Sequence, residues 1–195
     1  GQHGATTMLR AVRVFRAAAV RSFATAPDLF AVLGVERRFN LDAAELHGGY
    51  KVLMARLHPD RFGSASQEEK QSVADQAAAI TDAYSELKQP HRRASHLLEL
   101  LGGPLTEGDS GSLLGPPFLM EIMELREELE ALRASPDEGR LAELRARNRS
   151  QVDALCSELA SAFASSQLDD ARRLTAQLQY LQRVHEEIDA QTPAT

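Results

Sequence analysis

The chain has 195 residues, enough for one or two small domains, and 43% of them are hydrophobic, as is ordinary for a globular protein with a buried core. Aromatic residues make up only 5% and tryptophan is absent, a balance that favours packed helices over sheets. The net charge of −6 argues against nucleic-acid binding, which needs a basic face. No apolar run approaches the roughly 20 residues of a bilayer span, so we expect no membrane partner either.

Residues 1–27 differ from the rest of the chain because they carry four arginines and no acid. The residues before Met8 resemble a cloning remnant. From Leu9 to Thr25 the apolar residues cluster on one side of a helix plotted at about 100° per residue, and the arginines lean to the other side. An acid-free, arginine-rich amphipathic segment is typical of a mitochondrial transit peptide, although a basic tail without fixed structure has the same composition. We therefore expect residues 1–27 to be a remnant followed by a transit peptide.

Residues 28–101 are expected to form a domain around two long antiparallel helices joined by a loop at 58–65. Apolar residues recur at helical spacing along both helices, so each has one buried stripe. A short helix precedes this pair and another follows it. The expected helix starts are Asp28, an Asp42–Glu45 capping box, a Ser66–Glu69 capping box and Pro90, and the expected stops are Gly34, Pro59 and Gly102.

Residues 102–117 are crowded with glycine, serine and proline, which is typical of a linker between domains. Residues 118–191 contain three long helical stretches separated by short connections. Short connections favour antiparallel neighbours, so we expect a three-helix bundle. The first stretch spans Phe118 to Ala134, Ser135 is expected to cap the second, and Ser166 with Asp169 is expected to start the third.

Enzyme signatures are missing from the sequence, which has no Walker loop and no GxGxxG, GxSxG or HExxH motif. The single cysteine, Cys156, allows no intrachain disulfide and no cysteine-based zinc site, and its apolar neighbours favour an inert buried thiol over a reactive one. We therefore expect no metal, no cofactor and no enzymatic activity. The enzyme alternative is a small metal-dependent hydrolase that uses His58 and Asp60, but no third ligand lies at ligand spacing.

The tripeptide His58-Pro59-Asp60 stands in the loop between the two long helices. A helical hairpin with a proline at its tip would display the Asp60 carboxylate to a partner, where it could enter an ion pair or a polar network. The alternative is a plain loop with a helix-stopping proline. Basic residues flank the tripeptide: Lys51 and Arg56 before it, and Arg61 after it.

Four stretches of the chain resemble known families: DLFAVLGV (28–35), YKVLMARLHPDRF (50–62), AAAITDAYSELKQPHRRASHLLEL (77–100) and FLMEIMELREELE (118–130). The first three resemble the J-domain of DnaJ-type co-chaperones. Together with the fourth they resemble the HscB family of iron–sulfur-cluster J-proteins in its mitochondrial form. The resemblance covers about residues 28–191. It implies an all-α fold, with an N-terminal J-domain (an antiparallel helical hairpin plus short helices) and a C-terminal three-helix bundle.

The resemblance implies an adaptor with two binding sites. Through the His58-Pro59-Asp60 tip and its basic neighbours Lys51, Arg56 and Arg61, the J-domain would stimulate the ATPase of a DnaK/HscA-class heat-shock chaperone in the mitochondrial matrix. The C-terminal domain would bind an IscU-type iron–sulfur scaffold protein and deliver it to that chaperone. The family places scaffold contacts at positions that match Leu119, Met120, Met123, Glu124, Glu127 and Tyr180.

The helix that starts at Phe118 gives an independent reason to expect a binding surface. Ile122 and Leu125 belong to its core stripe, whereas Leu119, Met120 and Met123 fall on nearly the opposite side. A helix of a three-helix bundle needs one buried stripe, so a second apolar patch calls for another partner. The alternative is that the J-domain covers this patch as the contact between domains.

Some positions depart from the family pattern. The single cysteine cannot form the tetracysteine zinc module of animal members. Ala131 stands where an acid is often found, Tyr180 replaces a phenylalanine, and the linker is longer than usual. The alternative function is a general J-domain co-chaperone that binds unfolded clients through Leu119, Met120 and Met123.

Overall fold

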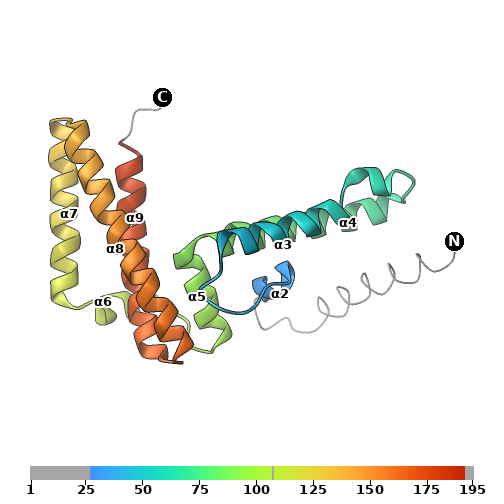
Figure 1. Ribbon diagram of the computed structural model, residues 1–195, viewed down its shortest axis with the longest axis horizontal. Helices are drawn as coiled ribbons and strands as arrows, with labels where there is room; N and C mark the ends of the chain where they lie inside the picture. Colours follow the sequence, from blue (N-terminus) through green and yellow to red (C-terminus); the bar gives the residue numbers. More distant parts are fainter. Residues whose placement is uncertain (1–26, 107, 192–195) are drawn as a thin grey trace.

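The computed structural model describes residues 27–106 and 108–191, and all regular secondary structure in these two ranges is helical. Figure 1 shows two arms that meet at an angle: α2 to α5 form one arm and α7 to α9 form the other. No helix in the described ranges combines the length and the apolar composition that a membrane crossing requires. The elements are α2 (Leu29–Leu33), α3 (Ala43–Arg56), the 3-10 helix η1 (Pro59–Phe62), α4 (Gln67–Lys88), α5 (Pro90–Leu100), α6 (Asp109–Leu113), α7 (Pro116–Ala134), α8 (Glu138–Ala164) and α9 (Leu168–Asp189).

The first arm is a hairpin of α3 and α4, against which α2 packs. Asp28 starts α2, because its side chain accepts a hydrogen bond from the Phe30 N–H. Gly34 ends the helix with a φ of 67°, in the left-handed region that favours glycine. α2 lies so close to α3 that a Cβ on Gly49 would be 3.0 Å from the Leu33 carbonyl oxygen. Glycine at position 49 therefore permits this helix contact.

The two predicted capping boxes of this arm have different outcomes. Ser66 and Glu69 form the reciprocal pair of hydrogen bonds at the start of α4, as predicted. At α3, Asp42 caps the helix by accepting from a backbone N–H of the first turn. Glu45, however, accepts a 2.5 Å hydrogen bond from Arg38. The prediction of an Asp42–Glu45 capping box was therefore wrong, because the Arg38 guanidinium binds the Glu45 carboxylate.

The second arm is the predicted three-helix bundle, and the all-α fold class is confirmed. Each of its helices turns one apolar stripe toward a common core. Within that core the completely buried Asn148 donates a 3.1 Å hydrogen bond to the Leu181 carbonyl oxygen. The buried core residues are Ile122, Leu125, Leu129, Leu132, Leu144, Leu181, Val184 and Ile188.

Two predicted helix starts in the bundle were wrong. α8 is capped by the side chain of Asp137 and not by Ser135, which lies at the end of α7. α9 begins at Leu168 without a side-chain cap, because Ser166 completes the end of α8. Ser166 has a φ of 55°, and the N–H groups of Ser166 and Gln167 bond back to carbonyls in the last turn of α8. This is the Schellman pattern, with serine at the position that glycine usually occupies.

The segment predicted as a linker, residues 102–117, is partly helical, since α6 lies within it and α7 begins within it. Asp109 of α6 accepts a 2.8 Å hydrogen bond from Arg172 of α9. A hydrogen bond from the Thr106 backbone N–H is the main reason why the pKa of Asp109 is lowered. Leu114 is buried. These contacts fasten the segment to the bundle.

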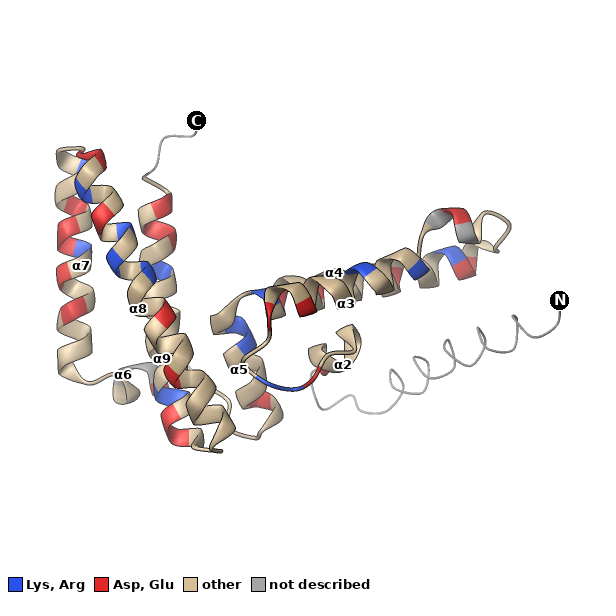
Figure 2. Cartoon of the chain, in the orientation of Figure 1, with Lys and Arg blue, Asp and Glu red and all other residues tan. Residues whose placement is uncertain are grey.

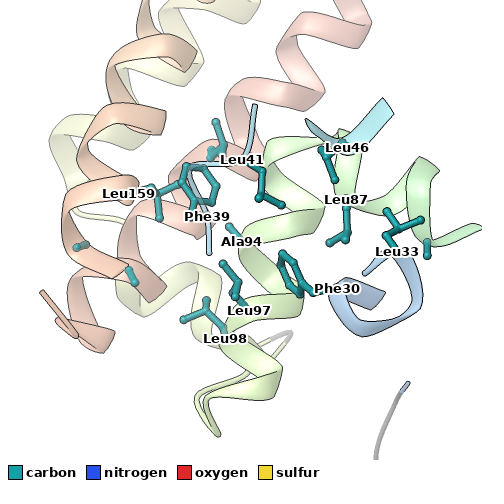
Figure 3. Packing of buried hydrophobic residues seen from close by; sticks show 14 of the residues in the cluster. Phe30, Leu33, Phe39, Leu41, Leu46, Leu87, Ala94, Leu97, Leu98 and Leu159 are labelled. Atoms are coloured by element: carbon teal, nitrogen blue, oxygen red, sulfur yellow. The ribbon is translucent and has the colours of Figure 1, made fainter. Parts of the chain in front are cut away.

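One hydrophobic cluster runs through both arms (Figure 3). Phe39, between α2 and α3, stacks on Phe163 of α8 with ring centroids 5.7 Å apart. The guanidinium carbon of the buried Arg93 lies 5.1 Å from the Phe39 ring centroid. The core therefore continues from the first arm into the bundle. The buried bundle residues in this shared core are Leu159, Ala162, Ala171, Leu174 and Leu178.

Candidate functional site

The His58-Pro59-Asp60 tripeptide lies at the tip of the hairpin, at the end far from the bundle (Figure 1). The predicted loop contains η1 here. His58 is extended and caps η1, since its Nδ1 accepts from the Asp60 N–H at 3.4 Å. The same Nδ1 lies 3.5 Å from the Asp60 carboxylate. The side chains of His58 and Asp60 are 61% and 90% exposed, so the tip presents a carboxylate to solvent.

Aromatic side chains brace the middle of the hairpin. The rings of Tyr50 on α3 and Tyr84 on α4 stack with centroids 4.6 Å apart. The Tyr84 hydroxyl lies 3.5 Å from Nδ1 of His47, and the Lys88 ammonium lies 5.9 Å from the Tyr84 ring centroid. These contacts hold α3 beside α4, and so they fix where the tip stands relative to the rest of the arm.

Of the three predicted basic residues near the tip, the structure describes the side chains of two. Lys51 and Arg56 are exposed on α3, and neither pairs with a carboxylate among the described residues. The side chains of Pro59 and Arg61 lie outside what the structure describes. Val52, next to Lys51, is an apolar residue that is 53% exposed, and it was not predicted as a candidate binding residue. Its position off the buried stripe of α3 is the sequence signal that could have identified it.

The predicted second surface lies on α7. Met120 and Met123 are each 61% exposed, and Leu119 is half-buried. We call these three residues the α7 patch. Glu124 and Glu127 are exposed beside it, and no described residue pairs with either carboxylate. α7 therefore offers an apolar surface with two acidic groups available to a partner.

Tyr180 of α9 extends the α7 patch. α7 and α9 run in the same direction, and Arg126 of α7 pairs with Glu187 of α9 at 3.2 Å. Leu119 and Tyr180 each lie about two helical turns before these partners, which places them on the same seam of the bundle surface. The Tyr180 ring is half-buried against the bundle core, and the Arg183 guanidinium carbon lies 5.4 Å from its centroid. The contact with Arg183 was not predicted.

The first arm does not cover the α7 patch. It packs on α8 and α9 of the bundle, through Phe39 and through α5, where Gln179 donates a 3.1 Å hydrogen bond to Ser95. No residue of α7 belongs to the shared core. For the described residues, the alternative of a patch sealed by the contact between domains was therefore wrong.

Cys156 and the potential metal-ligating side chains are the remaining groups of interest in the described ranges. Cys156 is half-buried against the shared core, and burial raises the pKa of its thiol, which keeps it protonated and unreactive at neutral pH. The described ranges contain no group of three or more His, Cys, Asp or Glu side chains placed to hold a metal ion. The exposed pair of His58 and Asp60 thus has no third ligand beside it.

The chain is similar to known proteins in both sequence and structure. A family model described as the HSCB C-terminal oligomerisation domain matches residues 114–189. The solved structure of the chaperone HscB from Vibrio cholerae is 33% identical, and its TM-score is 0.71. The match to that structure covers 84% of this chain and 96% of the bacterial one.

Curated relatives give the same result. The co-chaperone protein HscB homolog of Vibrio cholerae is 43% identical over 110 residues, which are 56% of this chain and 64% of that protein. The iron-sulfur cluster co-chaperone protein HscB homolog of Arabidopsis thaliana is 32% identical over 161 residues, which are 83% of this chain and 62% of that protein. The chain thus spans a little under two thirds of the length of these relatives.

Proposed function

Because the chain belongs to the HscB family of co-chaperones, we propose that it is an adaptor in iron–sulfur cluster biogenesis and not an enzyme. It binds an IscU-type scaffold protein and delivers it to a DnaK/HscA-class heat-shock chaperone, whose ATPase it stimulates. The arginine-rich, acid-free composition of residues 1–27 supports a mitochondrial matrix location, although residues 1–26 lie outside the described part of the chain.

One observation carries this proposal: two exposed surfaces of different chemistry stand on different arms. At the hairpin tip, Asp60 is an exposed carboxylate, and Lys51 and Arg56, which pair with no carboxylate in the described part of the chain, lie along α3. On the bundle, Met120 and Met123 are exposed apolar groups. Two partners can therefore bind at the same time without competing for the same residues.

The tip acts on the chaperone through charge. The hydrogen bond between the Asp60 N–H and His58 fixes the turn, so that little ordering entropy remains to be lost when the Asp60 carboxylate binds. The carboxylate can then accept hydrogen bonds from a cationic group of the chaperone. Lys51 and Arg56 would steer an acidic chaperone surface toward α3.

The α7 patch acts on the scaffold mainly through burial. Full burial of the exposed Met120 and Met123 side chains contributes at most about 1.5–3 kcal/mol each before the costs of association are subtracted, and Leu119, which is already half-buried, contributes less. Methionine adapts its shape to a partner surface. The unpaired carboxylates of Glu124 and Glu127 favour a partner with basic residues at the rim.

A substitution at the tip tests the chaperone half of the proposal. Asp60→Ala is expected to abolish stimulation of the ATPase, while the helical circular dichroism and the affinity for the scaffold stay unchanged. Asp82→Ala is the matched control, because Asp82 is also an exposed carboxylate of the same hairpin. Normal stimulation by Asp60→Ala in a steady-state phosphate-release assay would contradict the role of the tip.

A substitution on the bundle tests the scaffold half. Changing Leu119, Met120 and Met123 together to serine is expected to weaken scaffold binding at least about tenfold in calorimetry. Leu101→Ser is the control, since Leu101 is also an exposed leucine (52%) and directly follows α5, away from α7. Unchanged binding by the triple variant with intact circular dichroism would remove the basis for this surface.

The exposed methionines also suit the alternative function, a general co-chaperone for unfolded clients. The two functions differ in what the α7 patch binds. Titration with a permanently unfolded protein distinguishes them, because a dedicated adaptor should give no heat of binding in that titration while it binds the scaffold normally.

A further inference from the structure

Arg183 is an exposed arginine one helical turn after Tyr180 on α9. Its guanidinium carbon lies 5.4 Å from the centroid of the Tyr180 ring, which is close enough for a cation–π contact. A guanidinium that contacts a ring through its flat face keeps its N–H groups for other partners, since these groups lie in its own plane. Arg183 can therefore contact Tyr180 and still donate hydrogen bonds to another molecule.

The charge of Arg183 is available to a partner, because it pairs with no carboxylate in the described ranges. The two acids that follow it at helical spacing on α9 are already engaged. Glu186 accepts a 3.2 Å hydrogen bond from Gln182, and Glu187 pairs with Arg126 of α7 at 3.2 Å. A carboxylate that neutralises Arg183 by contact would therefore have to come from another molecule or from outside the described residues.

Arg183 lies at the edge of the proposed scaffold surface. The pair of Arg126 and Glu187 marks the level at which α7 and α9 stand side by side, and the two helices run in the same direction (Figure 1). Arg183 lies four residues before its member of this pair, and Met123 lies three residues before the other. Both therefore stand about one helical turn before the pair. A partner that rests on Met123 and Tyr180 has Arg183 at its edge.

The two edges of this surface differ in the sign of their charge. Glu124 and Glu127 are exposed on α7 and have no partner among the described residues. At about 100° per residue, both stand farther round α7 from the α9 seam than Met123 does. Arg183 stands on the opposite side, because it also lines the cleft between α5 and α9. The apolar groups thus lie between acids at one edge and a cation at the other.

We infer that Arg183 is a further scaffold-binding residue, which binds a carboxylate of the scaffold while the Tyr180 ring holds its guanidinium in place. This inference rests on the proposed function, because the partner is the scaffold that covers the α7 patch. A carboxylate matches the fork of a guanidinium and can accept two parallel N–H bonds. The ring restricts the guanidinium before binding, so less side-chain entropy is lost. Edges of opposite charge then favour one orientation of the bound scaffold over the reverse.

Calorimetric titration of the full chain with an IscU-type scaffold protein tests the role of Arg183. Arg183→Gln is expected to weaken binding about three- to tenfold at low salt, because the pair with the carboxylate is lost. The loss should shrink as the salt concentration is raised, since salt screens this pair in the unchanged chain. Arg183→Lys should recover only part of the affinity, because an ammonium keeps the charge but lacks the fork. Arg149→Gln is the matched control, since Arg149 is an exposed arginine of α8 that pairs with no carboxylate in the described ranges.

A double-mutant cycle tests the role of the ring. Tyr180→Leu keeps an apolar side chain at this position but removes the ring. In that background Arg183→Gln should weaken binding less than about twofold, because the guanidinium is no longer held in place. An equal effect of Arg183→Gln with and without the ring would contradict the positioning of Arg183 by Tyr180.

The outcomes separate Arg183 from the α7 patch. If Arg183→Gln binds as tightly as the unchanged chain while the serine variant of the α7 patch binds weakly, the inference is wrong and the proposed function stands. If neither variant weakens binding, both are wrong. A loss that is the same at every salt concentration also contradicts a carboxylate partner. A salt-dependent loss in Arg183→Gln that Arg149→Gln lacks, with unchanged circular dichroism of both, supports the inference.

Discussion

The shared core predicts that a substitution in the bundle destabilises the distant hairpin. Leu178 lies on α9, is 1% exposed and belongs to the cluster that contains Phe30 and Leu98 of the first arm. Leu178→Ala removes buried methyl and methylene groups and leaves a cavity, which costs about 2–5 kcal/mol of unfolding free energy. Since each 1.4 kcal/mol corresponds to about a factor of ten, the slowest amides of α4 should exchange about 30- to 4000-fold faster.

Native-state hydrogen exchange, read by mass spectrometry on peptides from α4 and α9, measures this effect. Leu144→Ala is the matched control, because Leu144 is also fully buried but belongs to the core of the bundle alone. It should accelerate exchange in α9 more than in α4. If Leu178→Ala exchanges its α9 amides faster but its α4 amides at the unchanged rate, the core does not couple the two arms.

Three local features give further predictions. Gly49→Ala should lower the free energy of unfolding, measured in urea, by about 1–3 kcal/mol, because the alanine Cβ would lie 3.0 Å from the Leu33 carbonyl oxygen. Gly48→Ala should raise the free energy of unfolding by about 0.5–1 kcal/mol, because position 48 has open space around it. Ser166→Gly should raise the melting temperature, because φ is 55° there and glycine adopts that conformation without strain. Burial lowers the pKa of His91 below 6.5 in the folded state, so the unfolded chain binds more protons than the folded chain just below pH 6.5. The free energy of unfolding should therefore decrease as the pH is lowered through this range. His91→Gln should reduce the dependence of the unfolding free energy on pH in this range, and urea unfolding at several pH values measures that dependence.

Local signals in the sequence predicted most helices and failed where a neighbour in space intervened. Asp28 and Ser66 cap helices as expected, because a cap depends only on the residues of the first turn. Glu45 does not close its capping box, because Arg38 binds it.

The contact between the arms could not be predicted, for a more general reason. Leu159, Leu174 and Leu178 are apolar residues of the bundle helices, and all three are buried. Helical periodicity does not say which element covers a buried face, and here the first arm covers part of it.

The α7 patch and the tip were found by different reasoning. Angular position on a single helix was sufficient to place Met120 and Met123 outside the core, and both are exposed. The role of Asp60 came from family resemblance, since an exposed acid at a turn is common and has no specific chemistry of its own. Arg183 was missed because it matters only through its place beside Tyr180.

In the proposed function, the shared core determines how binding of one partner affects the other. The tip and the α7 patch contribute no residue to the shared core, so neither partner needs to rearrange it on binding. The adaptor then acts mainly by holding both partners on one frame, which turns their encounter into an intramolecular event at a raised effective concentration. A variant that loosens the shared core, such as Leu178→Ala, should therefore weaken this linkage, because a mobile joint spreads the scaffold over more orientations relative to the tip.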